Sequence, residues 1–150
     1  MLVLHSLLRW AVLAAGCVAF ARALGGMRAH RDWTSADNRA GQWFVAALDL
    51  QLLVGLALYA MLSPMTSVAF QDFGAAMGNS ILRFWAVEHL AGMVVGIALA
   101  HVGRVRVRRT ADAARRHKLA AIFFGLALVA IMATIPWPGT PAGRPLLPGL

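Results

Sequence analysis

Two histidines are the residues of this chain best suited to hold a cofactor. His5 and His89 each stand inside a long apolar segment, and antiparallel helices would bring both to the same end. Two neutral imidazoles that face each other across a gap commonly hold the iron of a b-type haem. Small residues along both segments leave room for the flat macrocycle. The pattern predicts His5 and His89 as haem ligands, with interfacial, hydrogen-bonded histidines as the alternative.

Charged side chains accompany both histidines. Arg9 lies one helical turn after His5, and Glu88 directly precedes His89. At a rise of about 1.5 Å per residue, both charges lie on the order of 12 Å from the outer ends of their helices. We therefore expect an Arg9 to Glu88 ion pair, with an outward-reaching Arg9 and a protonated Glu88 as the alternative. Arg9 or Arg83 could then neutralise a haem propionate.

The remaining polar residues point less clearly to chemistry. Asp49 and Gln51 fall within an apolar segment, so Asp49 must be protonated, paired or hydrated. His101 stands at the far end of its segment, and we interpret it mainly as an interfacial residue. His30 and His117 lie among basic loop residues, where we expect both to be solvated. The single cysteine provides no disulfide framework and no CxxC metal motif.

The composition indicates the helices that must position these residues. Of 150 residues, 60% are hydrophobic and only 13% are charged, which is far from a soluble composition. We predict an all-α fold, an integral membrane four-helix bundle with short loops, built as a single transmembrane domain over 1–150. Each apolar segment has roughly the 20 residues that cross ~30 Å of hydrocarbon. The four predicted spans are 1–24, 41–62, 81–103 and 119–135.

Several local signals set the ends of these helices. We expect the first segment to be a retained helix rather than a signal peptide, because no basic residue precedes its apolar run. Gly25 and Gly26 should end it, and a capping-box pattern from Thr34 to Asp37 should begin the second helix. Between the second and third helices, a short surface helix or a plain loop is equally compatible with the sequence. The tail 136–150 is rich in Pro and Gly and is predicted to be extended and exterior.

The basic residues predict an orientation. The net charge is +8, and eleven of the fourteen Lys and Arg residues flank or fill the first and third loops, whereas the second loop, 63–80, has none. By the positive-inside rule, loops one and three are cytoplasmic and both termini lie on the outer, periplasmic side. We therefore expect a multi-pass protein of the bacterial inner membrane, with anionic lipids at its cytoplasmic face and no nucleic-acid partner.

Four stretches together resemble a family of small bacterial four-helix membrane proteins often labelled cytochrome-b-like. The stretches are HSLLRW from His5, QLLVGL from Gln51 with Tyr59, RFWAVEH from Arg83 with Met93, and IPWP from Ile135. The resemblance implies a haem-binding membrane protein. Family members often carry a histidine two residues before the glutamine, where this chain has Asp49. A ligand at that position would be missing here, whereas a site built from His5 and His89 is retained.

Two functions follow as hypotheses. The first is a b-type haem protein or subunit that transfers electrons near the outer face of the membrane. The second is a cofactor-free accessory subunit that stabilises a larger respiratory or photosynthetic membrane complex, with Arg9, Glu88 and Asp49 fixing the helix register. An enzyme is the third hypothesis and ranks below these two, because no nucleophile with its base, phosphate loop or metalloprotease helix is recognisable. A quinone site near Asp49 also remains open.

Overall fold

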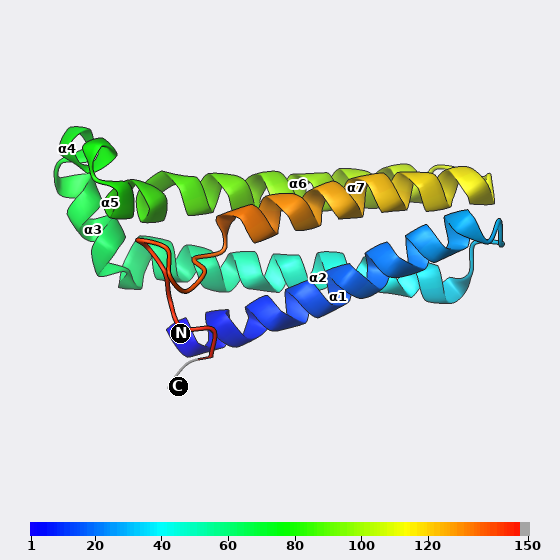
Figure 1. Ribbon diagram of the computed structural model, residues 1–150, viewed down its shortest axis with the longest axis horizontal. Helices are drawn as coiled ribbons and strands as arrows, with labels where there is room; N and C mark the ends of the chain where they lie inside the picture. The colour runs from blue at the N-terminus through cyan, green and yellow to red at the C-terminus, as the bar shows by residue number, and fades with distance from the viewer. Residues whose placement is uncertain (148–150) are drawn as a thin grey trace.

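Four long helices make up most of the protein in the computed structural model, which describes residues 1–147 (Figure 1). They are α1 (Leu2–Arg28), α2 (Ser35–Ala57), α6 (His89–Arg108) and α7 (Ala113–Thr134). A π-helical turn, η1 (Leu58–Leu62), prolongs α2, while α5 (Ser80–Arg83) and a second π-helical turn, η2 (Phe84–Glu88), lead directly into α6. Four continuous helical stretches are therefore long and apolar enough to cross a membrane: Leu2–Arg28, Ser35–Leu62, Ser80–Arg108 and Ala113–Thr134. No strand occurs among the described residues.

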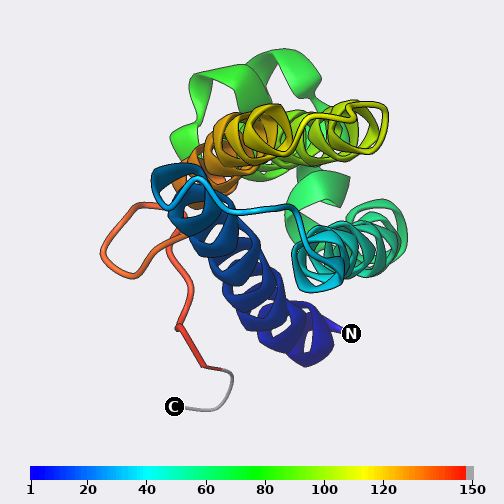
Figure 2. The ribbon, with the colours of Figure 1, turned by 90° about the vertical axis from the view of Figure 1, so that its right-hand side faces the viewer.

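The helices pack in a fixed order. α6 and α7 lie along each other, and α1 packs against both α2 and α7. α1 runs obliquely across its neighbours, which is clearest when Figures 1 and 2 are compared. The α1–α2 and α6–α7 loops lie at one end, and we call this the basic end (residues 22–39 and 104–118). The opposite end, the cavity end, holds the start of α1, residues 58–89 and the tail from Ile135.

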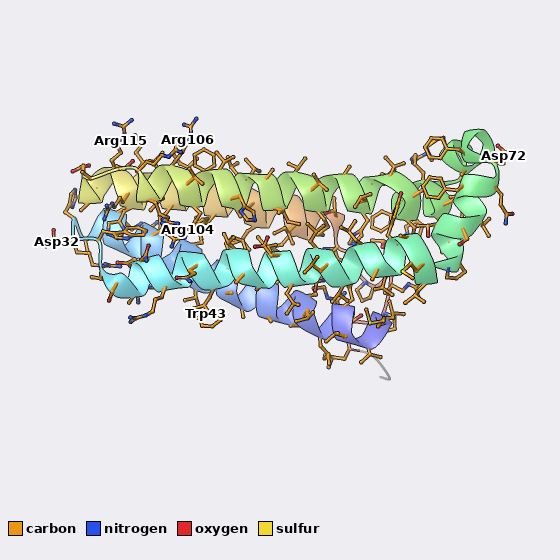
Figure 3. All side chains as sticks on the ribbon, turned by 180° about the vertical axis from the view of Figure 1, so that it is seen from behind. Asp32, Trp43, Asp72, Arg104, Arg106 and Arg115 are labelled. Atoms are coloured by element: carbon orange, nitrogen blue, oxygen red, sulfur yellow. The ribbon has the colours of Figure 1, made fainter. Side chains whose placement is uncertain are left out.

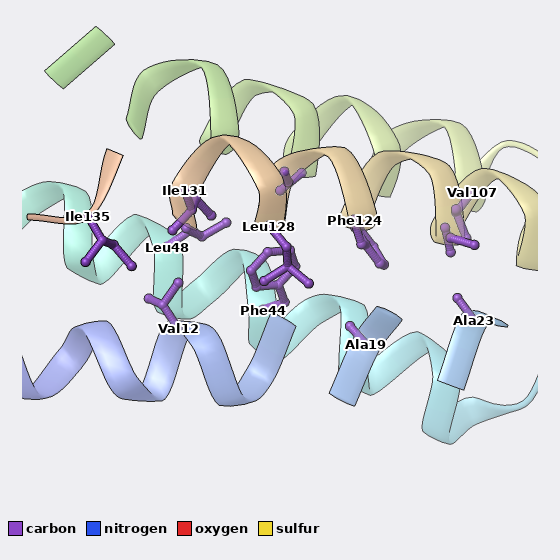
Figure 4. Close-up of a cluster of buried hydrophobic side chains, with 14 residues drawn as sticks. Val12, Ala19, Ala23, Phe44, Leu48, Val107, Phe124, Leu128, Ile131 and Ile135 are labelled. Atoms are coloured by element: carbon purple, nitrogen blue, oxygen red, sulfur yellow. The ribbon is translucent and has the colours of Figure 1, made fainter. Parts of the chain in front are cut away.

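Small residues allow the helix backbones to approach closely. A Cβ added to Gly96 of α6 would lie 2.7 Å from Ile131 Cγ1, and one added to Gly103 would lie 2.4 Å from Phe123 Cβ. Large side chains fill the space between these contacts, with Phe44 and Phe124 edge to face at 5.6 Å between ring centroids. The core seen in Figure 4 thus combines small contact residues with a few large apolar side chains.

The predicted start of the second helix is confirmed, but the predicted end of the first is wrong. Thr34 and Asp37 form the reciprocal capping box expected from the sequence. α1 continues past Gly25 and Gly26 to Arg28, and the chain turns at His30, which has a φ of 51°. That left-handed conformation just beyond the last turn is what ends the helix.

The cavity end is more irregular than the basic end. Two short helices, α3 (Pro64–Gln71) and α4 (Phe73–Gly78), form the second loop, so the helical alternative is the one observed. The tail is not extended: it turns back so that the Arg144 amide donates to the Pro136 carbonyl at 3.0 Å. Gly139, with a φ of 87°, supplies a conformation that few other residues adopt in this turn. The last part of the predicted tail, 148–150, lies outside the described residues.

Candidate functional site

A cavity of about 330 Å³ lies at the cavity end, between α1, α2, the start of α6 and the end of α7. Most of its wall is apolar, and leucines from α1, α2 and η1 form much of it. Its polar side chains include His5, Arg9, Gln51, His89 and Arg144, with Tyr59 and three small hydroxyl residues, Ser6, Ser63 and Thr66, beside them. An apolar cavity with a few convergent polar groups is the usual form of a small-molecule or cofactor site.

Both π-helical turns border this cavity. η1 contributes Leu58, Tyr59 and Leu62, and η2 contributes Trp85. The Tyr59 hydroxyl donates to the Ala86 carbonyl at 2.7 Å and so joins the two turns. Because π-helical turns in long helices are found frequently at functional sites, their position supports the assignment of the cavity as the candidate site.

His89 is oriented by the backbone of α7. Its Nδ1 lies 2.8 Å from the Thr134 carbonyl oxygen, which can only accept, so Nδ1 carries the proton. Nε2 makes no hydrogen bond to the described part of the chain, and the ring lines the cavity. A backbone carbonyl that fixes one imidazole nitrogen and leaves the other unprotonated is the arrangement commonly found at metal-ligating histidines.

His5 is held by Gln51 of α2. The Gln51 amide nitrogen donates to the His5 carbonyl at 3.1 Å and lies 3.2 Å from His5 Nε2. His5 Nδ1 and Gln51 Oε1 are buried and have no hydrogen-bond partner within the described residues. Unpaired buried polar atoms are costly, so their presence on a cavity wall indicates a place for a water molecule, an additional polar group or a cofactor.

The two imidazoles come together as the sequence predicts. Their ring centroids are 6.3 Å apart at an interplanar angle of 70°. Two imidazoles that share one metal atom, with metal–nitrogen bonds of about 2 Å, have ring centroids roughly 6 Å apart. Gly55 of α2 keeps the space beside His5 open, because an added Cβ would lie 3.1 Å from His5 Cε1. The spacing of the two rings therefore matches that of two imidazole ligands of one metal atom.

The expected Arg9 to Glu88 ion pair is wrong. Glu88 instead pairs with Arg83 at 2.6 Å, and both side chains are more than two fifths exposed. Residues five apart meet there because η2 has the i to i+5 hydrogen bonding of a π-helix, which turns Glu88 away from α1. Arg9 is buried and donates from Nη2 to the Leu146 carbonyl of the tail at 2.6 Å.

Of the two arginines predicted to serve a cofactor, only Arg9 reaches the cavity. Arg83 is engaged by Glu88 and by the Met77 carbonyl, and it does not line the cavity wall. Arg144 does line it, with its guanidinium carbon 5.1 Å from the ring centroid of Trp85. Sequence analysis missed Arg144 because an extended exterior tail was expected. Its signal was that it is the one basic residue in the tail 136–150.

Asp49 pairs with His101 and does not line the cavity. His101 Nε2 lies 2.7 Å from Asp49 Oδ1, and the two side chains are 45% and 49% exposed on the surface shared by α2 and α6. The pairing satisfies the requirement that an aspartate inside an apolar span find a partner. It also removes Asp49 from the candidate site, and Gln51 is the one of the two intramembrane polar residues that contributes to it.

The basic end is held by an ion-pair cluster around Asp37. The Asp37 carboxylate accepts from Arg31 at 2.6 and 2.7 Å and from Arg22 at 3.0 Å, and it completes the Thr34 capping box. The hydrogen bond from Arg31 to Asp37 raises the pKa of the Arg31 guanidinium above its ordinary value. This cluster fixes the α1–α2 connection.

His30 is exposed as predicted, but the prediction for His117 is wrong. His117 is fully buried, and its ring packs 4.9 Å from Trp33 between centroids. Neither of its ring nitrogens has a hydrogen-bond partner among the described residues. The ring occupies space that Gly26 leaves free, since a Cβ there would come within 2.1 Å of it.

No protein-family model, curated protein or solved structure matches this chain.

Proposed function

We propose that this chain is an integral membrane protein that binds a b-type haem between His5 and His89 and transfers electrons near the outer face of a bacterial inner membrane. It crosses the membrane as a four-helix bundle, with both termini outside and the basic end in the cytoplasm. The membrane assignment is supported by four apolar helices of spanning length. The orientation is supported by the concentration of basic residues at one end, where anionic lipids are the expected neighbours.

The observation that carries the haem proposal is the separation of the two imidazoles on one cavity. Their centroids are 6.3 Å apart, and each ring has one nitrogen in contact with the protein and one without a partner among the described residues. The Thr134 carbonyl holds His89 in the tautomer whose Nε2 can ligate a metal. Gln51 orders the ring of His5, which would ligate through Nδ1 once the Gln51 amide turns its Oε1 toward a protonated Nε2. Such preorganisation lowers the entropic cost of binding.

Two arginines complete the environment proposed for the cofactor. Arg9 and Arg144 both line the cavity, and guanidinium groups bind carboxylates through charge-assisted hydrogen bonds. We assign them to the propionates. A bound haem would supply a one-electron carrier, and the apolar wall would limit the access of water to it.

A visible spectrum of purified protein tests the proposal. Protein produced with ample haem should show reduced-minus-oxidised haem bands, and these should disappear in His5→Ala and His89→Ala. His30→Asn is the matched control, because His30 is exposed and asparagine tolerates its left-handed backbone. His89→Gln serves if the alanine variant does not fold. Absence of bands from haem-replete wild type, or bands that persist in folded variants at both positions, would overturn the proposal.

The Asp49 to His101 pair favours the accessory-subunit function as a second candidate. Both side chains are nearly half exposed on helices proposed to lie in hydrocarbon, where polar groups are costly. A helix of another subunit covering this surface would remove that cost. Isolation from native membranes in a mild detergent should then recover the chain in a larger complex, and Asp49→Ala with His101→Ala should release it. A chain that always migrates alone would contradict this candidate.

A further inference from the structure

A second cavity, of about 360 Å³, lies at the basic end, where the α1–α2 loop meets the end of α6 and the start of α7. Its wall is mainly polar, in contrast to the wall of the first cavity. We call it the loop pocket. The side chains that matter for its chemistry are Trp33, Thr34, Ser35, Asn38, Arg108 and Arg116.

Three arginines near the loop pocket are engaged within the protein. Arg22 and Arg31 bind Asp37, and Arg104 donates from Nη1 to the side-chain oxygen of Asn38 at 2.8 Å. The two arginines that line the pocket are different. The guanidinium of Arg108 makes no hydrogen bond or ion pair with the described residues, and Arg116 uses only Nε, toward the Thr110 carbonyl. Most of their donor capacity is therefore directed to something outside the chain.

The excess of positive charge around the pocket favours an anionic ligand. Eleven of the fourteen basic residues lie at the basic end, compared with three of the six acidic residues. Asp37 is saturated by its own partners, and Asp112 accepts from the Arg115 amide as the α7 cap. Asp32 is the remaining carboxylate at this end, and it is exposed (Figure 3). No acidic residue lines the pocket itself.

The shape of the wall favours a phosphate with an attached group over a small halide. Two guanidinium groups can bind several oxygens of one phosphate, and the Ser35 hydroxyl adds a neutral hydrogen-bonding group. Trp33 forms an aromatic side of the pocket, suited to the carbon atoms next to the phosphate. A volume of 360 Å³ exceeds what a bare ion needs.

We propose that the loop pocket binds a phosphate group, carried either by the head group of an anionic phospholipid or by a soluble phosphate compound. Arg108 and Arg116 hold the phosphate, and Trp33 covers the adjoining carbon skeleton. This is a defined site with one occupant, distinct from the general attraction of a basic surface for anionic lipids. It does not depend on the cofactor proposed for the opposite end.

Native mass spectrometry of the whole chain in a mild detergent tests the proposal. The protein is mixed with phosphatidylglycerol or with phosphatidylcholine, and the retained lipid is counted. We expect one retained phosphatidylglycerol. Arg108→Gln with Arg116→Gln should weaken its retention by about tenfold or more, because two charge-assisted contacts are lost. The matched control is Arg109→Gln with Arg115→Gln, which makes the same change of charge on exposed arginines that do not line the pocket.

The outcomes distinguish a lipid phosphate from a soluble phosphate, and a defined site from diffuse electrostatic attraction. If glycerol 3-phosphate or inorganic phosphate at millimolar concentration displaces the lipid, the pocket accepts soluble phosphates; if neither competes, the lipid head group is the ligand. Equal loss in the two double variants would show diffuse electrostatic attraction only and would overturn the proposal. Arg116 also holds the Thr110 carbonyl, so the double variant removes a structural contact as well. Arg108→Gln alone is therefore the second variant, and its retention of phosphatidylglycerol should also fall.

Discussion

The same four helices end in two different ways. At the basic end, the Asp37 carboxylate is almost completely enclosed and accepts hydrogen bonds from Arg22, Arg31 and Thr34. At the cavity end, His5 Nδ1, Gln51 Oε1 and Arg9 Nε are buried without partners among the described residues, and all three side chains line a cavity. At the basic end, the two ring nitrogens of His117 are also buried without such partners, but His117 lines neither cavity. Paired buried groups rigidify a structure, whereas unpaired ones reduce its stability unless a ligand completes them. The Asp37 cluster at the basic end thus fixes the helices, and the unpaired groups on the cavity wall at the other end are left for a ligand.

The largest effect on stability should come from Asp37. In Asp37→Asn the carboxylate that joins Arg22, Arg31 and the start of α2 loses its charge, so we expect the free energy of unfolding to fall by about 2–4 kcal/mol. Unfolding by titration with a denaturing detergent measures it. Asp32→Asn is the control, since Asp32 is exposed in the same loop and its loss should cost less than about 0.5 kcal/mol. Equal effects of the two variants would contradict the fixing role of the cluster.

An intermediate effect is expected at two adjacent glycines of α1. In Gly26→Ala the new Cβ would lie 2.1 Å from His117 Cε1, so we expect destabilisation of about 1–3 kcal/mol. Gly25 has no neighbour within 4 Å, and Gly25→Ala should stabilise the helix by about 0.5–1 kcal/mol. Changes of opposite sign in the free energy of unfolding at these two neighbouring positions would confirm the tight packing of the basic end. Thermal unfolding in detergent is sufficient to measure both, and equal signs would count against that packing.

The sequence predicted the depth of residues along the helices better than the direction in which their side chains point around the helix axis. Composition and length predicted four apolar helices, and counting residues from the helix ends placed His5 and His89 in the outer part of two antiparallel helices, where their rings lie 6.3 Å apart. The same residue count predicted an ion pair between Arg9 and Glu88 that does not form. The π-helical turn η2 changes the direction in which Glu88 leaves the helix, and Glu88 pairs with Arg83 instead. A π-helical turn leaves no clear mark in hydrophobic periodicity, so this error could not be avoided from the sequence.

The two ends also differ in how much of their detail the sequence carries. The Thr34 to Asp37 capping box is a local pattern and was predicted correctly. Burial of His117 depends on α7 beginning at Ala113 and on its packing against Gly26, which are contacts between distant segments. The one available signal was a glycine within a helical pattern, which often has a packing reason. The role of Arg144 likewise depends on the fold of the tail.

The smallest effect on stability, and the sharpest test of the comparison, is expected at Gly55. In Gly55→Ala the new Cβ would lie 3.1 Å from His5 Cε1, and the ring can shift into the cavity beside it, so the free energy of unfolding should change by less than about 1 kcal/mol. Binding should suffer more, because a ligand displaced by a few tenths of an ångström no longer matches a rigid partner such as His89. We expect about tenfold weaker haem binding, measured by titration of the apoprotein with haem.

Gly78→Ala is the control for Gly55→Ala, because Gly78 lies at the same end of the molecule and has no neighbour within 4 Å. It should leave both haem binding and stability close to those of the wild type. If Gly55→Ala instead unfolds the protein as strongly as Asp37→Asn, the cavity end is as tightly packed as the basic end and the contrast between them fails. If Gly55→Ala leaves haem binding unchanged, haem binding does not depend on the position of His5. The unpaired polar atoms on the cavity wall would then serve a different ligand.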